Sequence, residues 1–419
     1  MKDIVKQHKS NSSIGVYSVC SAHPFVIEAT FAYELENETQ VIIEATSNQV
    51  NQFGGYTGMT PIDFVNYVYE IADKTRFPKD RIILGGDHLG PNCWQNETAG
   101  EAMEKSRELI KQYVEAGFTK IHLDASMSCA DDTMPLDPSI VAHRAAELCT
   151  IAEKYVSNEN RDKITYIIGT EVPVPGGEAC EIDAVHVTKL KDVRATVDTH
   201  ITAFEAFGIG DAINKVIGVV VQPGVEFDHS NVIRYDKLKA DEISQYIEST
   251  AWVYEAHSTD YQTATHLKEL VQTHFSILKV GPALTFALRE ALFSLAEIEN
   301  RLVKTEQNSQ FKQVVDSVLL DKPKYWKSYY GEKHSDIINN LHFSFSDRIR
   351  YYWTDDRIQA SQQRLINNLN DIDIPLTILS QFMPNQYIKV SSGIITSSPK
   401  MLIIDKIQEI IAQYSLACK

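Results

Sequence analysis

The stretch Arg81-Ile82-Ile83-Leu84-Gly85-Gly86-Asp87-His88-Leu89-Gly90-Pro91 places an acid and an imidazole side by side at the end of a short buried strand. Successive side chains of a strand point to opposite faces, so Asp87 and His88 project the same way only if the backbone bends. Two glycines before the pair and a Gly-Pro after it supply the freedom to bend. Taken alone, the pair fits a capping aspartate followed by a surface histidine equally well.

Strand-like apolar runs alternate with helical segments on both sides of this stretch. The predicted strands cover residues 14–20, 40–46, 81–86, 120–124, 164–170, 216–221, 251–256 and 275–280. The predicted helices cover residues 24–36, 61–74, 101–117, 139–155, 190–207, 239–249, 263–274 and 286–300. This alternation indicates a parallel sheet with helical crossovers. Eight such units favour a closed TIM (β/α)8 barrel, an α/β fold, over an open sheet.

The pattern changes after residue 300. The segments 309–320, 335–353, 356–370 and 400–416 have a helical pattern, and strand signals become few. We therefore predict a barrel in residues 1–300 and a C-terminal helical extension in residues 301–419, packed on the barrel. The extension has no low complexity, so we do not predict disorder for it.

Composition limits the function of this 419-residue chain. Its net charge of -16 argues against nucleic acid or an anionic membrane as the main partner, but leaves phosphorylated small molecules open. The six cysteines are scattered and form no C-x-x-C pair, so no disulfide framework is indicated. With no secretory leader and no apolar run of about 18 residues, we expect a cytoplasmic protein without membrane spans. Neither a dinucleotide-binding glycine motif nor a P-loop is present.

Polar residues cluster where the predicted strands end. In a barrel these ends converge on one rim, which is where active sites lie. Exposure to solvent would explain serine, asparagine and lysine there, but explains less well a repeated choice of histidine beside an acid. We therefore predict a functional rim.

A divalent metal, with zinc favoured, is the first kind of chemistry that the rim suggests. Its candidate ligands are His88, Glu171, His229 and His257. Three protein ligands with an open position are typical of catalytic zinc. Because the ligands follow separate strands, no spacing motif tests the set. His122 lies inside a strand, and we interpret it as a hydrogen-bonded barrel residue.

Proton transfer is the second kind of chemistry, with candidates Glu44, Asp87, Asp124 and Glu255. A carboxylate buried among others has a raised pKa, which suits a general base. The alternative is that these carboxylates orient neighbouring histidines.

Substrate contacts are predicted in two loops. Asn48, Gln49, Asn51 and Gln52 suit recognition of sugar hydroxyls, or else form a loop capped by its own side chains. Gly281 precedes a helix whose free N–H groups could hold a phosphate, a common arrangement in barrels. Lys279 is a candidate substrate contact, and a Schiff-base role is the less favoured alternative.

Several long blocks resemble a known family, the Z subunits of D-tagatose-1,6-bisphosphate aldolase (GatZ/KbaZ). These blocks are residues 18–24, 43–59, 85–91, 122–129, 169–177, 221–231, 254–262, 278–292 and 346–353. The resemblance covers the chain from end to end and implies a TIM barrel related to class II aldolases. It also implies a separate, zinc-dependent catalytic Y subunit, whose activity and stability the Z subunit supports as a chaperone-like partner.

The resemblance implies galactitol or N-acetylgalactosamine catabolism, through degradation of D-tagatose 6-phosphate, and does not separate the two pathways. An older family label, tagatose-6-phosphate kinase, gains no support, because no nucleotide-binding loop is visible. The alternative function is an autonomous metal-dependent C4 epimerase or aldolase acting on a phosphorylated ketohexose such as tagatose 6-phosphate. In that case Asp87 and His88 resemble the class II aldolase pair that transfers a proton and binds zinc. Association into a homo-oligomer is left open.

Overall fold

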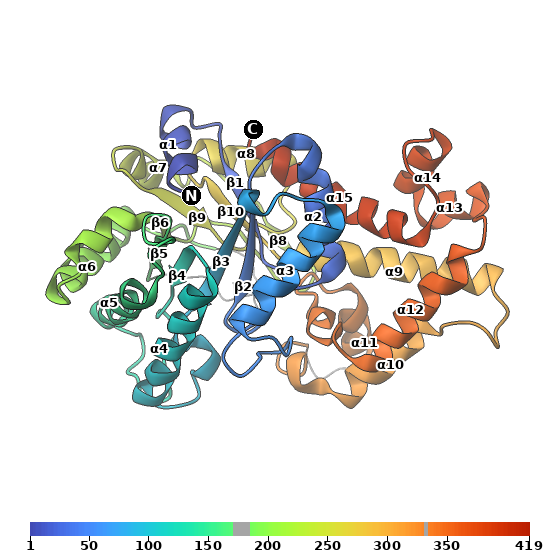
Figure 1. The fold of residues 1–419 in the computed structure, drawn as a ribbon, viewed down its shortest axis with the longest axis horizontal. Coiled ribbons are helices and arrows are strands. Elements are labelled where there is room, and N and C mark those ends of the chain that lie inside the picture. Colours follow the sequence, from blue (N-terminus) through green and yellow to red (C-terminus); the bar gives the residue numbers. More distant parts are fainter. Residues whose placement is uncertain (171–184, 331–333) are drawn as a thin grey trace.

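Eight parallel strands close into a barrel in the computed structural model, which describes residues 1–170, 185–330 and 334–419 (Figure 1). Around the barrel the strands follow the order β1 (Val16–Val19), β10 (Ile277–Val280), β9 (Val253–Ala256), β6 (Val216–Val220), β5 (Thr165–Gly169), β4 (Lys120–Leu123), β3 (Ile82–Leu89) and β2 (Val41–Thr46). The predicted TIM barrel is confirmed.

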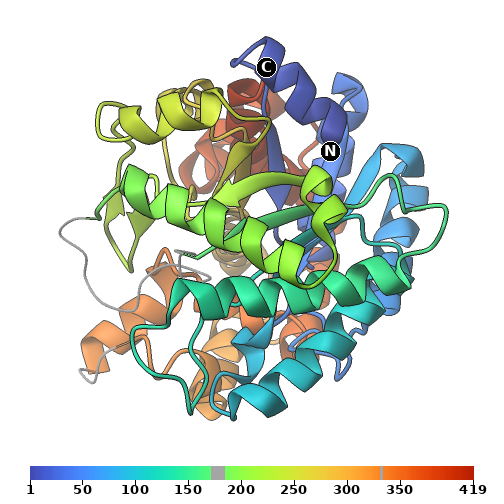
Figure 2. The same ribbon diagram turned by 90° about the vertical axis from the view of Figure 1, so that its left-hand side faces the viewer.

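Helices surround the strands and alternate with them along the sequence. They are α2 (Pro24–Asn37), α3 (Pro61–Thr75), α4 (Ala99–Ala116), α5 (Pro138–Tyr155), α6 (Leu190–Ala206), α7 (Asp241–Glu248), α8 (Ala264–Gln272) and α9 (Pro282–Leu302). Figure 2 shows α4, α5 and α6 lying across the outside of the sheet. Local signals set their ends: Thr98 and Glu101 form a capping box at the start of α4, and Gly117 ends it with φ at 104°.

The amino-terminal end of the barrel is apolar. Helix α1 (Lys2–Ser10) contributes Ile4 and Val5 to this core. They belong to one cluster with inward residues of the strands, Val16, Ile42, Ile83, Ile167, Ile217, Val220, Val253 and Ile277. This apolar cluster fills one end of the barrel, and the acidic and histidine side chains of the pocket described below lie toward the other, carboxyl-terminal end.

The Asp87-His88 pair lies within β3, because the strand continues to Leu89. The predicted bend is present: His88 has φ at 48°, and the pairing of β3 with β4 shifts register between Gly86 and Leu89. The residue that follows the neighbouring strand β2 supports this bend, since the Ser47 hydroxyl donates to the His88 carbonyl at 2.7 Å. Gly85 serves a packing purpose, because a Cβ there would lie 2.6 Å from Cγ of Glu44.

The C-terminal part is helical, as predicted. It contains α10 (Phe311–Asp321), η4 (Pro323–Tyr325), α11 (His334–Phe343), η5 (Arg348–Tyr352), α12 (Asp356–Asn370), α13 (Leu376–Phe382), α14 (Pro384–Ser391) and α15 (Pro399–Ala417). The predicted helix over 335–353 is wrong in its middle, because Asp347 adopts φ of 45° and separates α11 from η5. Helices α13 and α14 escaped prediction, as did the hairpin of β7 (Glu226–Phe227) and β8 (Val232–Ile233).

Helix α15 returns to the barrel and packs against α2, α8 and α9 (Figure 1). Its inner face includes Leu402, Ile403 and Ile407, which are fully buried. The end of the chain is therefore part of the helical layer around the strands. A domain division at residue 300 stays a prediction.

In the part of the chain that the structure describes, no helix is both long and apolar enough to cross a membrane.

Removing buried volume from α15 should destabilise the whole protein. We expect Ile407→Ala to lower the free energy of unfolding by about 2–5 kcal/mol, because the side chain is fully buried and its loss leaves a cavity. In the same helix, Leu416 is 63% exposed. Leu416→Ala should therefore change this free energy by no more than about 0.5 kcal/mol. Urea denaturation measures both, and equal costs would contradict the packing described.

Candidate functional site

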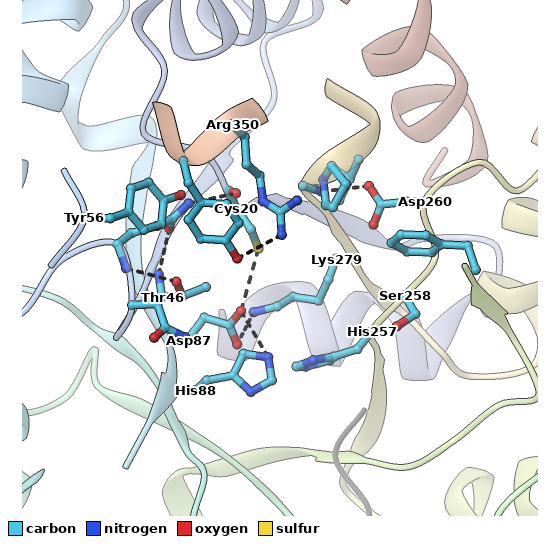
Figure 3. A pocket seen from close by; sticks show the side chains of 17 residues that line it. Cys20, Thr46, Tyr56, Asp87, His88, His257, Ser258, Asp260, Lys279 and Arg350 are labelled. Atoms are coloured by element: carbon cyan, nitrogen blue, oxygen red, sulfur yellow. Dashed lines mark hydrogen bonds and ion pairs between the residues drawn. The ribbon is translucent and has the colours of Figure 1, made fainter. Parts of the chain in front are cut away.

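A pocket of about 80 Å³ lies at the carboxyl ends of the strands (Figure 3). Its floor is built by Asp87 and His88 from β3, His257 after β9 and Lys279 from β10. Arg350, in η5 of the helical extension, reaches into the pocket from the side opposite to His88. The site therefore combines a barrel floor with a roof from the C-terminal part.

Two buried lysines hold the carboxylates of the floor. The Lys120 ammonium lies 2.6 Å from Glu44 Oε1 and 2.5 Å from Glu255 Oε2. The Lys279 ammonium lies 2.8 Å from Asp87 Oδ1 and 3.5 Å from Glu255 Oε1, and it also contacts Glu44. All five side chains are buried. Paired charges of this kind are tolerated in a barrel interior, whereas unpaired ones are costly.

The pKa values follow from these contacts. Burial by itself would raise the pKa of Glu255, but the ammonium groups of Lys120 and Lys279 hold it well below its usual value. Burial would lower the pKa of Lys279, but Asp87 and the other carboxylates raise it well above its usual value. Lys279 therefore keeps its proton, which favours a charged substrate contact over a Schiff-base amine.

Three imidazoles meet beside this network. The ring centroids of His88, His122 and His257 lie 5.0–5.2 Å from one another. Each ring also contacts a carboxylate, with Asp124 at 2.7 Å from His88, Asp87 at 3.0 Å from His122 and Glu255 at 3.0 Å from His257. Carboxylates placed in this way orient histidines that bind metals.

This set fits a divalent metal. Asp87, His122, Glu255 and His257 offer ligand atoms that all lie within 4.8 Å of one another. The Nε2 atom of His122 is buried and has no hydrogen-bond partner among the described residues. Burial lowers the pKa of His257 to about 4, so its imidazole is neutral at pH 7 and keeps a lone pair for a ligand.

The predicted ligands have different outcomes. His88 and His257 lie together at the site, and His122, which we interpreted as a barrel residue, joins them. His229 was wrongly predicted: its Nδ1 lies 3.1 Å from the Ser344 hydroxyl and its Nε2 lies 2.8 Å from a backbone carbonyl of the extension. This residue lies in the turn of the antiparallel hairpin after β6, where it contacts the extension. Glu171 lies outside the described residues.

The predicted proton-transfer carboxylates divide into two groups. Glu44, Asp87 and Glu255 belong to the lysine network, and Asp87 also faces the pocket. Asp124 binds His88 with one oxygen and accepts from the backbone N–H and the hydroxyl of Ser126 with the other. Its geometry therefore matches the alternative role of orienting a histidine.

Half of the predicted polyol loop faces the cavity. Asn48 and Gln49 line the pocket. Asn51 instead organises its own loop, since its Oδ1 accepts from the N–H groups of residues 53 and 55. Gln52 donates to the carbonyl of Lys105 in α4. The prediction of sugar contacts from Asn51 and Gln52 is not supported by these positions, because Asn51 is bonded within its own loop and the Gln52 side chain is directed to α4.

The predicted phosphate site at Gly281 is already filled. Asp260 Oδ1 accepts from the N–H of Gly281 at 3.0 Å and from the N–H of Ala283 at 2.8 Å. A carboxylate from this chain thus already accepts hydrogen bonds from the free backbone N–H groups at the start of α9. Burial raises the pKa of Asp260 to about 6. A second anion at the same N–H groups would be repelled.

The sequence interpretation missed Lys120 and Arg350. A signal for Lys120 existed, because the period of two in β4 places it on the same face as His122 and Asp124. Arg350 had no comparable signal, because it reaches the barrel from a distant helical segment.

The fold and the site define an α/β barrel with a charged, histidine-lined mouth. Comparisons with known proteins show the family to which this barrel belongs. The model of the family described as D-tagatose-1,6-bisphosphate aldolase subunit GatZ/KbaZ-like matches residues 1–419. This chain belongs to that family.

Relatives match over their full length. Proteins named D-tagatose-1,6-bisphosphate aldolase subunit GatZ from Salmonella enteritidis PT4 and Salmonella newport are 57% identical over 418 residues, which is 100% of this chain and 99% of each relative. A crystal structure from Sinorhizobium meliloti 1021, described as a "probable tagatose 6 phosphate kinase", is 43% identical with a TM-score of 0.89. It covers 96% of this chain and 100% of its own.

Acid should remove the stabilising effect of Glu255. Its folded pKa lies below the ordinary value of 4.5, so its contribution is fully present above that value and is lost as the pH falls. We therefore expect Glu255→Gln to be less stable than the wild type at pH 6, and this difference to shrink toward pH 3. Urea denaturation across this range measures it. Glu104→Gln, at an exposed position of α4, is the matched control, and a difference that does not vary with pH would contradict the network.

Metal binding should depend on the imidazole cluster. We expect the purified chain to bind Zn²⁺ or Mn²⁺, and His122→Ala to weaken this binding by at least about tenfold. Isothermal titration calorimetry after chelation measures the affinity. His266→Ala, in the first turn of α8, removes a histidine far along the chain from the cluster and serves as control. Equal affinity of the two variants would exclude His122 as a ligand.

Proposed function

We propose that this chain is the non-catalytic Z subunit of a class II D-tagatose-1,6-bisphosphate aldolase, and that it raises the activity and stability of a separate catalytic Y subunit. The observation that carries this proposal is the 57% identity, over the whole chain, to proteins named subunit GatZ. Those names favour a subunit over an autonomous C4 epimerase. The corresponding process is galactitol or N-acetylgalactosamine catabolism.

The barrel mouth suits a phosphorylated ketohexose. Asn48 offers an amide for hydroxyl groups, and Lys279 offers a permanent positive charge. Gln49 lines the same cavity, but its amide is bonded to Thr46 and Cys20. Asp87 faces the same cavity, and it would carry the proton in the alternative function of an autonomous epimerase or aldolase. Asp124 positions His88 through the 2.7 Å hydrogen bond.

We propose zinc as the metal, held by His122 and His257 together with Asp87 or Glu255. Neutral imidazoles and carboxylates in a dry site are typical zinc ligands. When bound, such an ion polarises a carbonyl or hydroxyl oxygen. The protein's own part is to keep His257 neutral, which burial does, and to orient the imidazoles, which the surrounding carboxylates do.

A cytoplasmic location and a two-part organisation complete the proposal. The cysteines of the described part, including Cys20 and Cys93 near the surface, are free thiols, which agrees with a reducing compartment. The proposed parts are a barrel of residues 1–300 and an extension of residues 301–419. Helix α15 ties them together through its contacts with α2 and α8.

Mixing experiments test the subunit role. We expect this chain alone to cleave tagatose 1,6-bisphosphate slowly or not at all, and a cognate Y subunit to gain several-fold in cleavage rate and in thermal half-life when this chain is added. Size-exclusion chromatography should show a joint peak. An equal amount of an unrelated barrel protein is the control.

Two results would contradict the proposal. One is an unchanged rate and half-life of the Y subunit on mixing. The other is rapid cleavage by this chain alone.

A further inference from the structure

A second cavity, of about 440 Å³, adjoins the pocket at the barrel mouth. The two share part of their lining, namely Cys20, Gln49, Tyr56, Gly281 and Arg350. The second cavity lies between the rim of the barrel and the helical extension, since its wall also includes Ser21 and His23 near β1 and Gln359 and Gln362 of α12. We call these two adjoining cavities the recess, and the charged floor belongs to the first of them.

Arg350 is the one formally charged side chain among the described residues that line the second cavity. Its guanidinium donates to the carbonyls of Ser346 and Asp347 and, at 3.1 Å, to the hydroxyl of Tyr351. In the described part of the chain no carboxylate lies within ion-pair distance of it. The positive charge thus faces the recess without a counter-ion.

The acidic side chains near Arg350 have other hydrogen-bond partners. Asp347 accepts from the hydroxyl of Thr285 at 2.5 Å, and Asp260 caps α9. The rest of the wall is neutral: burial lowers the pKa of His23 to about 3, and α12 presents glutamine amides. The described residues that line this cavity therefore offer an anion one cation and several neutral hydrogen-bonding groups, and no carboxylate is among them.

We propose that Arg350 binds a phosphate group of a sugar phosphate whose carbon chain extends toward Lys279 and His257. A guanidinium matches phosphate oxygens with two parallel hydrogen bonds, which a lysine does not provide. This assignment rests on the proposed function for its ligand class, a phosphorylated ketohexose. It moves the phosphate site from Gly281, where Asp260 already occupies the N–H groups, to the helical extension.

Calorimetric titration of the full chain with tagatose 6-phosphate and with tagatose tests the assignment. We expect the wild type to bind the phosphorylated sugar more tightly. Arg350→Gln should weaken the affinity for tagatose 6-phosphate by roughly 10- to 100-fold, the range expected for charge-assisted hydrogen bonds. Its affinity for tagatose should equal that of the wild type. Arg350→Lys keeps the charge and should lie between.

A matched control is Arg357→Gln in α12, which removes the same charge from an ion pair with Asp321 at the surface. It should bind both sugars as the wild type does. Inorganic phosphate should compete with tagatose 6-phosphate in the wild type and compete less well in Arg350→Gln.

Three results would overturn the assignment. They are a wild type that does not prefer the phosphorylated sugar, an Arg350→Gln variant with unchanged affinity, and a loss that is equal for both sugars, which a purely structural role would produce. These titrations involve no Y subunit. A negative result here therefore leaves the mixing experiment standing, and failure of the mixing experiment leaves the titrations interpretable.

Discussion

The buried ammonium of Lys120 lies between Glu44 and Glu255, and the rest of the site depends on this interaction. It joins β2, β4 and β9 across the barrel, and Lys279 adds β10 and β3 through Asp87. Three carboxylates are too costly to bury without these two cations. Once they are paired, the carboxylates have oxygens left to orient imidazoles, and the upper barrel becomes a polar floor above an apolar base.

The helical extension completes what the barrel begins. Helix α15 packs on the barrel, while η5 reaches over the strand ends and carries Arg350 and Tyr351 to the recess. The floor holds the groups suited to metal and proton chemistry, and the roof holds the cation suited to phosphate. This division would explain why a supportive subunit keeps a charged mouth. In our proposal the site binds a sugar phosphate, whichever subunit cleaves it.

Alternation of apolar runs was sufficient to predict the barrel, because the carboxyl ends of parallel strands must meet at one edge. That rule placed Glu44, Asp87, His88, Glu255, His257 and Lys279 at one mouth. It failed for His229, which follows a strand in the sequence but lies in the turn of an antiparallel hairpin, although Asp228, Ser230 and Asn231 are typical turn residues. It also missed Lys120, near the start of β4, and Arg350, whose position depends on tertiary packing that no local periodicity encodes.

A double-mutant cycle between Lys120 and Glu44 tests the central claim most directly. Lys120→Met and Glu44→Gln, alone and together, would be compared by their free energies of unfolding in urea at pH 7. The network predicts that each single change is costly and that the double variant costs less than the sum, by a coupling energy of about 1–3 kcal/mol. Strictly additive costs would show that the two buried charges do not stabilise each other and would contradict the account.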